Sequence, residues 1–266
     1  MKNLTKLLLG AASLAGLVAV AAPAFAQDAA APADAAPASP WGVSAAIDVQ
    51  SDYKFRGISQ NKRDPSPQGT VNVTGPDGFY VGSWASTIDW SLAGKNNNPG
   101  VEWDIYGGKH TDLWGVDWNI EPYYYAYPDA NTVGGPVASY FELINQFTKA
   151  FGPVTLQGTW AWSPQFSLGG GTGNYLAGNA AYTINDWLSI SGNVGHQWVQ
   201  AAKFNASSDY TYADIGVTGT YKGFSLDLRY SGTDLSASKC GFYMGTNHAC
   251  AGDFIATLTY TANLFP

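Results

Sequence analysis

Hydrophobic and polar positions alternate along most of the chain. Between residues 41 and 57 the odd positions are mostly apolar. The even positions carry every charge of the stretch: Asp48, Asp52, Lys54 and Arg56. A period of two is that of a β-strand, in which successive side chains point to opposite faces. The pattern predicts a strand with one apolar face and one charged face.

Twelve runs of this kind follow one another. They cover residues 41–55, 67–74, 78–87, 101–109, 116–127, 139–150, 153–163, 173–184, 187–200, 209–221, 224–234 and 252–264. Short turns such as "GPDG" at 75–78 and "KG" at 222–223 alternate with long connections. Short turns at one end, long loops at the other and an even strand count are typical of outer-membrane barrels. A β-propeller or sandwich would have no reason to alternate its loop lengths.

Composition supports a membrane protein that crosses with strands. Only 12% of the 266 residues are charged, against roughly 25% in an average soluble domain. After the N-terminus, no stretch approaches the ~20 consecutive apolar residues of a membrane-spanning helix. In lipid no water is present to pair with the backbone, so strands can pair all their N–H and C=O groups only in a closed barrel. We expect an all-β fold, a transmembrane antiparallel up-and-down β-barrel of twelve strands, in the outer membrane of a Gram-negative bacterium.

The N-terminal segment has the features of an export signal. Lys2 and Lys6 precede an apolar run over 7–20, and Ala24-Phe25-Ala26 forms a cleavage site. The run is short for a membrane anchor. We expect a signal peptide at 1–26, an Ala/Pro-rich periplasmic linker at 27–40 and the barrel at 41–266.

Aromatic residues gather toward the ends of several predicted strands. In a barrel these ends are the membrane interfaces, where aromatic girdles lie. The residues expected in a girdle are Tyr53, Phe55, Tyr123 to Tyr127, Trp160, Trp162 and Trp198.

Several segments resemble one known family. They are "SDYKFRGISQ" at 51–60, "GFYVGSWAS" at 78–86, "VEWDIYGG" at 101–108, "YYYAYP" at 123–128 and "YFEL" at 140–143. They are similar to the TorF-like porins of proteobacteria, also called the Gcw_chp family, and the likeness extends over most of 43–264. The resemblance implies an outer-membrane barrel and no defined solute. The Ala/Pro linker and the loop with the two cysteines stand apart from the family pattern.

Charges on the polar face of the strands are expected to line the lumen. Assigning faces by this alternation places nine acidic and three basic residues inward: Asp48, Asp52, Glu102, Asp104, Asp117, Glu121, Glu142, Asp214 and Asp227, with Lys54, Arg56 and Arg229. One interpretation is an electrostatic lining that favours cations or polar solutes. The other is a ladder of salt bridges that closes a narrow barrel.

The two cysteines, Cys240 and Cys250, fall in one long external loop of an exported chain. Such pairs usually form a disulfide, and free thiols or a metal site are the alternatives. Closing a loop of about ten residues would stabilise it by ~3 kcal/mol on the chain-entropy model.

The sequence offers little for catalysis or cofactors. A barrel hydrolase needs a His and a Ser two residues apart on one strand face, whereas His196 is followed at that spacing by Trp198 and His110 by Asp112. No His, Cys and Asp cluster has zinc spacing, and the net charge of -7 argues against nucleic acid. We expect no enzyme, no cofactor and no metal site.

Two functions remain open. The first is a porin or narrow diffusion channel for small polar or cationic solutes. The second is a non-conducting structural or adhesive barrel that acts through its external loops. The expected partners are outer-membrane lipid and the barrel assembly machinery, which recognises a C-terminal aromatic residue; here Phe265 is penultimate, an imperfect match.

Overall fold

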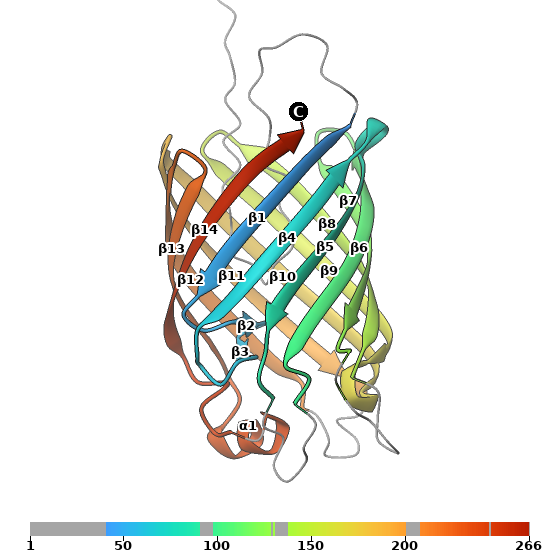
Figure 1. The fold of residues 1–266 in the computed structure, drawn as a ribbon, viewed down its shortest axis with the longest axis vertical. Coiled ribbons are helices and arrows are strands. Elements are labelled where there is room, and N and C mark those ends of the chain that lie inside the picture. The colour runs from blue at the N-terminus through green and yellow to red at the C-terminus, as the bar shows by residue number, and fades with distance from the viewer. Residues whose placement is uncertain are drawn as a thin grey trace, which may run out of the picture.

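A computed structural model describes residues 41–90, 98–128, 130, 138–200, 208–244 and 246–265. The predicted signal peptide and linker lie outside these residues. Within them, twelve strands form one closed antiparallel barrel (Figure 1). The strands are β1 (Gly42–Gln50), β4 (Ser66–Thr74), β5 (Phe79–Thr87), β6 (Val101–Asp112), β7 (Asp117–Ala126), β8 (Tyr140–Phe151), β9 (Val154–Phe166), β10 (Gly171–Asn185), β11 (Leu188–Val199), β12 (Tyr210–Tyr221), β13 (Phe224–Thr233) and β14 (Asp253–Phe265).

Each strand pairs with its neighbours in the chain, and β1 closes the barrel by pairing with both β4 and β14. The fold class and strand number predicted from the alternation are therefore confirmed. Smaller elements lie between the strands: the hairpin β2 (Lys54–Phe55) and β3 (Ile58–Ser59), the helix α1 (Ala237–Met244), and 3₁₀ turns at Pro76–Gly78 and Ser167–Gly169.

The short turns gather at one end of the barrel, together with the C-terminus, and α1 lies at the other end (Figure 1). In outer-membrane barrels the end with longer loops faces the cell exterior, so we call it the external end. The turn between β12 and β13 shows why a turn can be so short. Lys222 and Gly223 both have positive φ, 47° and 82°, as a two-residue type I′ hairpin requires.

The alternation of loop lengths has one exception. The connection between β9 and β10 was predicted to be long, at 164–172, but β10 begins at Gly171 and only 167–170 lie between the two strands. The strands extend into the glycine-rich "LGGGTGN" segment, because Gly171 and its successors pair with the end of β9. This external connection is as short as the 113–116 turn at the opposite end.

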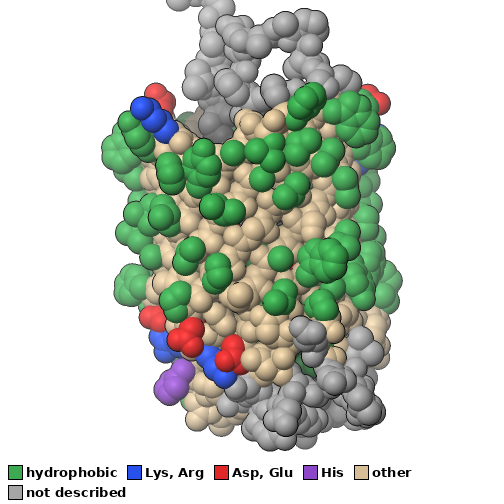
Figure 2. All heavy atoms as spheres, viewed as in Figure 1, with side chains coloured by type: hydrophobic (Ala, Val, Ile, Leu, Met, Phe, Trp, Pro, Cys, Tyr) green, Lys and Arg blue, Asp and Glu red, His purple; other side chains and the backbone are tan. Residues whose placement is uncertain are grey.

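Side chains divide between the two faces as the alternation predicted. Apolar side chains such as Ile47, Leu226 and Leu258 are 45–66% exposed on the outside. They form a belt over the strands, whereas charged groups gather at the two rims (Figure 2). An exposed apolar belt is stable against lipid and unfavourable in water. Among the described residues, no helix is long and apolar enough to cross a membrane.

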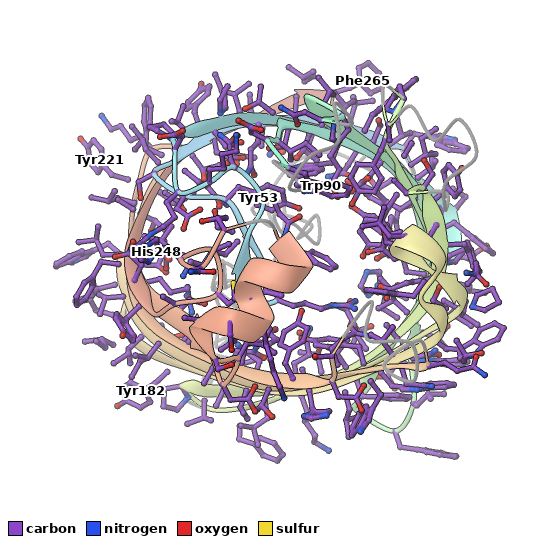
Figure 3. The ribbon with its side chains drawn as sticks, turned by 90° about the horizontal axis from the view of Figure 1, so that it is seen from below. Tyr53, Trp90, Tyr182, Tyr221, His248 and Phe265 are labelled. Carbon is purple, nitrogen blue, oxygen red and sulfur yellow. A yellow bond between two sulfur atoms is a disulfide. The ribbon has the colours of Figure 1, made fainter. Side chains whose placement is uncertain are left out.

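The buried core lies inside the barrel and is rich in tyrosine. Tyr106 stacks on Tyr123 with ring centroids 5.0 Å apart, and Tyr125 stacks on Tyr140 at 4.4 Å. Viewed along the barrel, Tyr53 and Trp90 lie within the ring of strands, whereas Tyr182, Tyr221 and Phe265 lie on its outside (Figure 3).

The predicted aromatic girdle is only partly correct. As predicted, four of these residues are 36–46% exposed on the outer face: Tyr124, Trp160, Trp162 and Trp198. The prediction for Tyr53, Phe55, Tyr123, Tyr125 and Tyr127 is wrong: Phe55 is partly buried and the four tyrosines are at most 6% exposed. Two causes explain this error. The strand β1 ends before Tyr53, and the odd positions of β7 share the inward face of Glu121.

Candidate functional site

The first external loop folds into the barrel instead of extending β1. The residues at 51–65 leave the wall after Gln50, form the β2–β3 hairpin inside the lumen and return at Ser66 (Figure 3). The hairpin is held together by a hydrogen bond from the Ser59 hydroxyl to the Asp52 carboxylate at 2.5 Å. The backbone amide of Gln60 also donates to the backbone carbonyl of Tyr53 at 2.7 Å. We call 51–65 the constriction loop.

The tip of the constriction loop is a two-residue turn of Arg56 and Gly57. Both have positive φ, 47° and 82°, which a type I′ turn requires. A side chain at Gly57 would also lie only 2.7 Å from Cβ of Tyr212. Arginine in this left-handed region costs about 1–2 kcal/mol, so the contacts of Arg56 must compensate.

The Arg56 guanidinium reaches across the lumen to two strands. It donates to both oxygens of Glu142 on β8, at 3.0 and 2.6 Å, and to the side-chain oxygen of Gln197 on β11. The face of Tyr175 lies 3.9 Å from the guanidinium carbon. Arg56 and Glu142 are at most 1% exposed. A bidentate, buried pair of this kind fixes the position of the loop tip.

The base of the constriction loop is attached to the last external loop. Lys54 donates to the backbone carbonyls of Ser231 and Ala251, at 2.9 and 2.7 Å, and the Ser59 amide donates to the Ala249 carbonyl at 2.8 Å. Arg63 forms an ion pair with Asp253 at the start of β14. Burial lowers the pKa of Lys54 from its usual value, and the nearby Asp52 opposes that effect.

The last external loop carries the predicted disulfide. Cys240 on α1 is bonded to Cys250, so the disulfide prediction is confirmed. The Cys250 carbonyl accepts from both the amide and the hydroxyl of Thr233, at the end of β13. The cross-link therefore shapes the segment that Lys54 and Ser59 contact.

One wall of the lumen presents carboxylates whose partners are tyrosine hydroxyls. On β6, Glu102 accepts from the Tyr127 hydroxyl at 3.0 Å, and Asp104 accepts from Tyr123 at 2.8 Å. Within the described part of the chain, neither Glu102 nor Asp104 has an ion pair. Glu121 on β7 accepts from the Tyr80 hydroxyl. We call Glu102, Asp104 and Glu121 the acidic wall.

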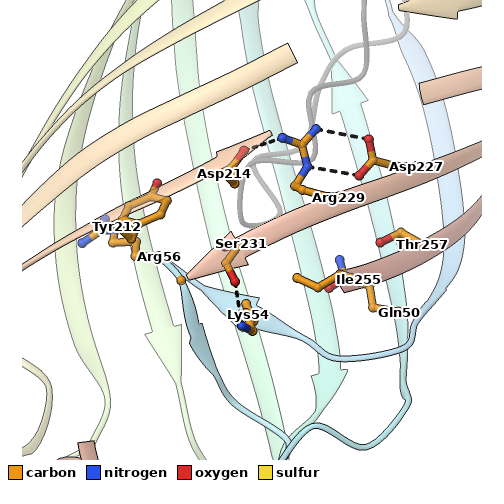
Figure 4. A pocket seen from close by; sticks show the side chains of 11 residues that line it. Gln50, Lys54, Arg56, Tyr212, Asp214, Asp227, Arg229, Ser231, Ile255 and Thr257 are labelled. Carbon is orange, nitrogen blue, oxygen red and sulfur yellow. Dashed lines mark hydrogen bonds and ion pairs between the residues drawn. The ribbon is translucent and has the colours of Figure 1, made fainter. Parts of the chain in front are cut away.

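Across the barrel, Arg229 on β13 binds two carboxylates. It forms ion pairs with Asp214 on β12 and with Asp227 on its own strand (Figure 4). It also donates to the Ser191 hydroxyl at 2.9 Å. Lys54 and Arg56 border the same cavity, whose free volume is about 30 Å³. A space of that size holds roughly two or three water molecules, so the lumen is narrow beside the constriction loop.

The remaining predicted lumenal acids lie apart from this constriction. Asp48 faces inward on β1 opposite Thr259 of β14. Asp117 lies near the short-turn end, where its half-exposed carboxylate contacts the His110 ring at 2.9 Å. Among the described residues, no group of three or more His, Cys, Asp or Glu side chains could hold a metal ion.

The alternation of positions along the strands did not identify several residues of the constriction. Gln197, Tyr175 and the tyrosines of the acidic wall are uncharged, and the sequence-based search considered charges only. Their signal was nevertheless present, because Tyr123 and Tyr125 occupy the same face of β7 as Glu121, and Tyr127 follows at the same spacing.

Residues 34–261 match a family model described as "Bacterial protein of unknown function (Gcw_chp)". The chain belongs to this family. The match confirms the resemblance inferred from the sequence segments and covers the whole constriction of the Gcw_chp barrel. No curated protein matches the chain.

Two solved structures similar to the Gcw_chp barrel are porins. The KdgM porin in complex with disordered oligogalacturonate has a TM-score of 0.52 and 6% identity, covering 82% of this chain and 98% of that one. The NanC porin has a TM-score of 0.51 and 9% identity, covering 83% of this chain and 98% of that one. At such low identity these comparisons establish the fold, which is that of the outer-membrane porins.

Proposed function

We propose that this barrel is a narrow diffusion channel of the outer membrane that favours cations and small polar solutes. The observation that supports it best is the constriction loop, which narrows the lumen directly beside the acidic wall. The porin-like fold favours a channel over an enzyme. In this proposal the twelve predicted charged residues line the route, and lipid and the assembly machinery are the protein's other partners.

The charge of the lumen gives the proposed channel its selectivity. Arg56 is neutralised by Glu142, and Arg229 lies between two carboxylates. Glu102 and Asp104 keep neutral hydroxyl partners instead. Carboxylates in a low-dielectric wall concentrate a negative potential that attracts cations and repels anions. Oligogalacturonate, named with KdgM, carries a carboxylate on each sugar, so we do not extend that ligand to this lumen.

Reversal potentials across a salt gradient test the proposal. The refolded mature protein in a planar bilayer should show single-channel conductance, with permeability for potassium above that for chloride. The preference should weaken as ionic strength rises, because the Debye length falls from about 10 Å at 0.1 M to about 3 Å at 1 M. Preference for chloride would contradict the electrostatic mechanism.

A second candidate is a non-conducting barrel that acts through its external loops. The tight packing around Arg56 and the small free volume beside Arg229 favour it. Complete absence of conductance in a correctly folded preparation, judged by altered gel migration before and after boiling, would support this candidate over the channel.

A further inference from the structure

A wide groove lies on the outer face of the barrel, over strands β11 to β14 and beside the end of β1. Its free volume is about 480 Å³, against about 30 Å³ beside Arg229. Ligand sites usually measure roughly 300–1,000 Å³. We call it the outer groove, and the outward side chains of its lining include Ser51, Ile215, Leu228, Tyr230, Phe254 and Ala256.

Small side chains produce the outer groove. On the outward face of β14, Ala256 lies between Phe254 and Leu258, which are 78% and 53% exposed. Across the sheet, Ala256 has Leu228 on one side and Ser51 on the other. Ser51 is the first residue after β1, where the chain turns inward to form the constriction loop. Two small side chains therefore lie side by side among larger ones, which hollows the surface.

The outer groove lies in the external half of the apolar belt. Phe254 is the second residue of β14, and Tyr230 lies three residues before the end of β13. Their rings contact each other edge to face, with centroids 5.1 Å apart. Because the belt of such a barrel faces the hydrocarbon of the bilayer, the groove opens to the acyl chains of the outer leaflet.

The polar groups at the end of β1 are paired within the protein. The Ser51 amide donates to the Ala256 carbonyl at 2.8 Å, and the Ala256 amide donates to the Ser51 hydroxyl oxygen at 2.9 Å. Burying a polar group of a ligand without a hydrogen-bond partner is costly. The groove therefore suits a hydrocarbon chain and disfavours a polar head group.

Shape favours a lipid chain over a second copy of the barrel. The outer face of a barrel is convex and rigid, so a neighbouring barrel would touch the rims of the groove and leave its interior empty. Empty space forfeits dispersion contacts. A flexible acyl chain can enter the groove and contact protein on several sides. In a membrane this van der Waals packing sets the affinity, because lipid tails are as apolar as the protein surface.

We propose that the outer groove holds one acyl chain of an outer-leaflet lipid more tightly than the rest of the apolar belt does. The inference is independent of the proposed channel, since the groove and the lumen lie on opposite faces of the wall.

Native mass spectrometry of the full mature barrel tests the site. The barrel is refolded into phosphatidylglycerol vesicles and extracted into detergent, and the retained lipids are counted. We expect one lipid per barrel to survive extraction. Phosphatidylcholine with the same acyl chains should give the same result, because the groove contacts the chain and not the head group. Absence of a retained lipid, or retention of only one of the two lipids, would overturn the inference.

Filling the groove with a large side chain should remove the lipid. Ala256→Trp and Val217→Trp, both in the lining, should each lower the retained fraction by about tenfold, because the chain loses its packing contacts. The matched controls are Ala262→Trp, farther along β14, and Val81→Trp on β5. These controls should retain the lipid as the wild type does. Two positions are used so that a misfolded variant, recognised by lost heat-dependent gel migration, leaves the other informative.

Equal retention in the groove and control variants would place the lipid elsewhere on the belt and refute the site. A wild-type dimer that both groove variants abolish would assign the groove to a second copy of the chain and overturn the proposal. Absence of channel current with the lipid retained would contradict only the proposed channel.

Discussion

Arg56 and Glu142 lie 86 residues apart in the chain and form a two-pronged ion pair inside the barrel, with nitrogen–oxygen distances of 3.0 and 2.6 Å. Neither side chain is more than 1% exposed. The pair joins the tip of the constriction loop to β8 on the far wall. The pair therefore affects both the width of the lumen and the charge on its wall.

Replacing Arg56 should widen the channel and strengthen its preference for cations. Arg56→Gln removes the contact that holds the loop tip and leaves Glu142 without its cation. Removing one partner of a buried pair costs about 3–5 kcal/mol, so the loop should move away from the wall. Single-channel conductance and reversal potential are the measurements.

The double variant Arg56→Gln with Glu142→Gln is the control for charge. It should keep the larger conductance and lose the added cation preference. An increase in selectivity that persists in the double variant would show that Glu142 is not its source.

Neutralising the acidic wall should weaken cation preference without widening the lumen. Glu102→Gln with Asp104→Asn removes two carboxylates and retains groups that accept from Tyr127 and Tyr123. The reversal potential in a salt gradient should move toward zero. Asp186→Asn, in an exposed turn outside the lumen, is the matched control and should leave the potential unchanged. A similar shift of the reversal potential in both variants would show that surface charge, and not the acidic wall, sets the cation preference.

Two neighbouring positions on β14 should respond differently to arginine. Leu258 faces outward and is 53% exposed, whereas Thr259 faces inward and pairs with Asp48. Leu258→Arg puts a charge against lipid near the middle of the strand, at about 2–4 kcal/mol. Thr259→Arg should cost less, since its cation lies in the lumen beside Asp48. Denaturant titration in lipid vesicles compares the two, and equal losses would mean that the faces are misassigned.

Removing the disulfide should loosen the constriction loop at its base. Cys240→Ser with Cys250→Ser gives up about 3 kcal/mol of loop ordering on the chain-entropy model. The loop contacts of Lys54 and Ser59 should weaken in turn, which predicts noisier single-channel current and faster proteolysis in 51–65. Reduction of the wild type should reproduce the effect. Unchanged current noise under both treatments would show that the disulfide does not order the constriction loop.

The strand positions, the lipid-facing residues and the closed barrel followed from sequence because they depend on local periodicity. A period of two assigns each side chain to a face without knowledge of its neighbours, so the inward direction of Asp104 and the outward direction of Ile47 could be predicted. The same rule would have placed Tyr123 and Tyr125 inside, had it been applied to aromatic residues as it was to charges.

The path of the constriction loop was decided only by the tertiary structure. The strand pattern continues through Tyr53 and Phe55, yet the backbone turns inward because Arg56 reaches Glu142 and Gln197, 86 and 141 residues away. Periodicity also gives no position along the barrel axis, which depends on the register between strands. Which carboxylates meet a cation and which meet a tyrosine is therefore a property of the assembled barrel, since it depends on long-range distances that no local pattern encodes.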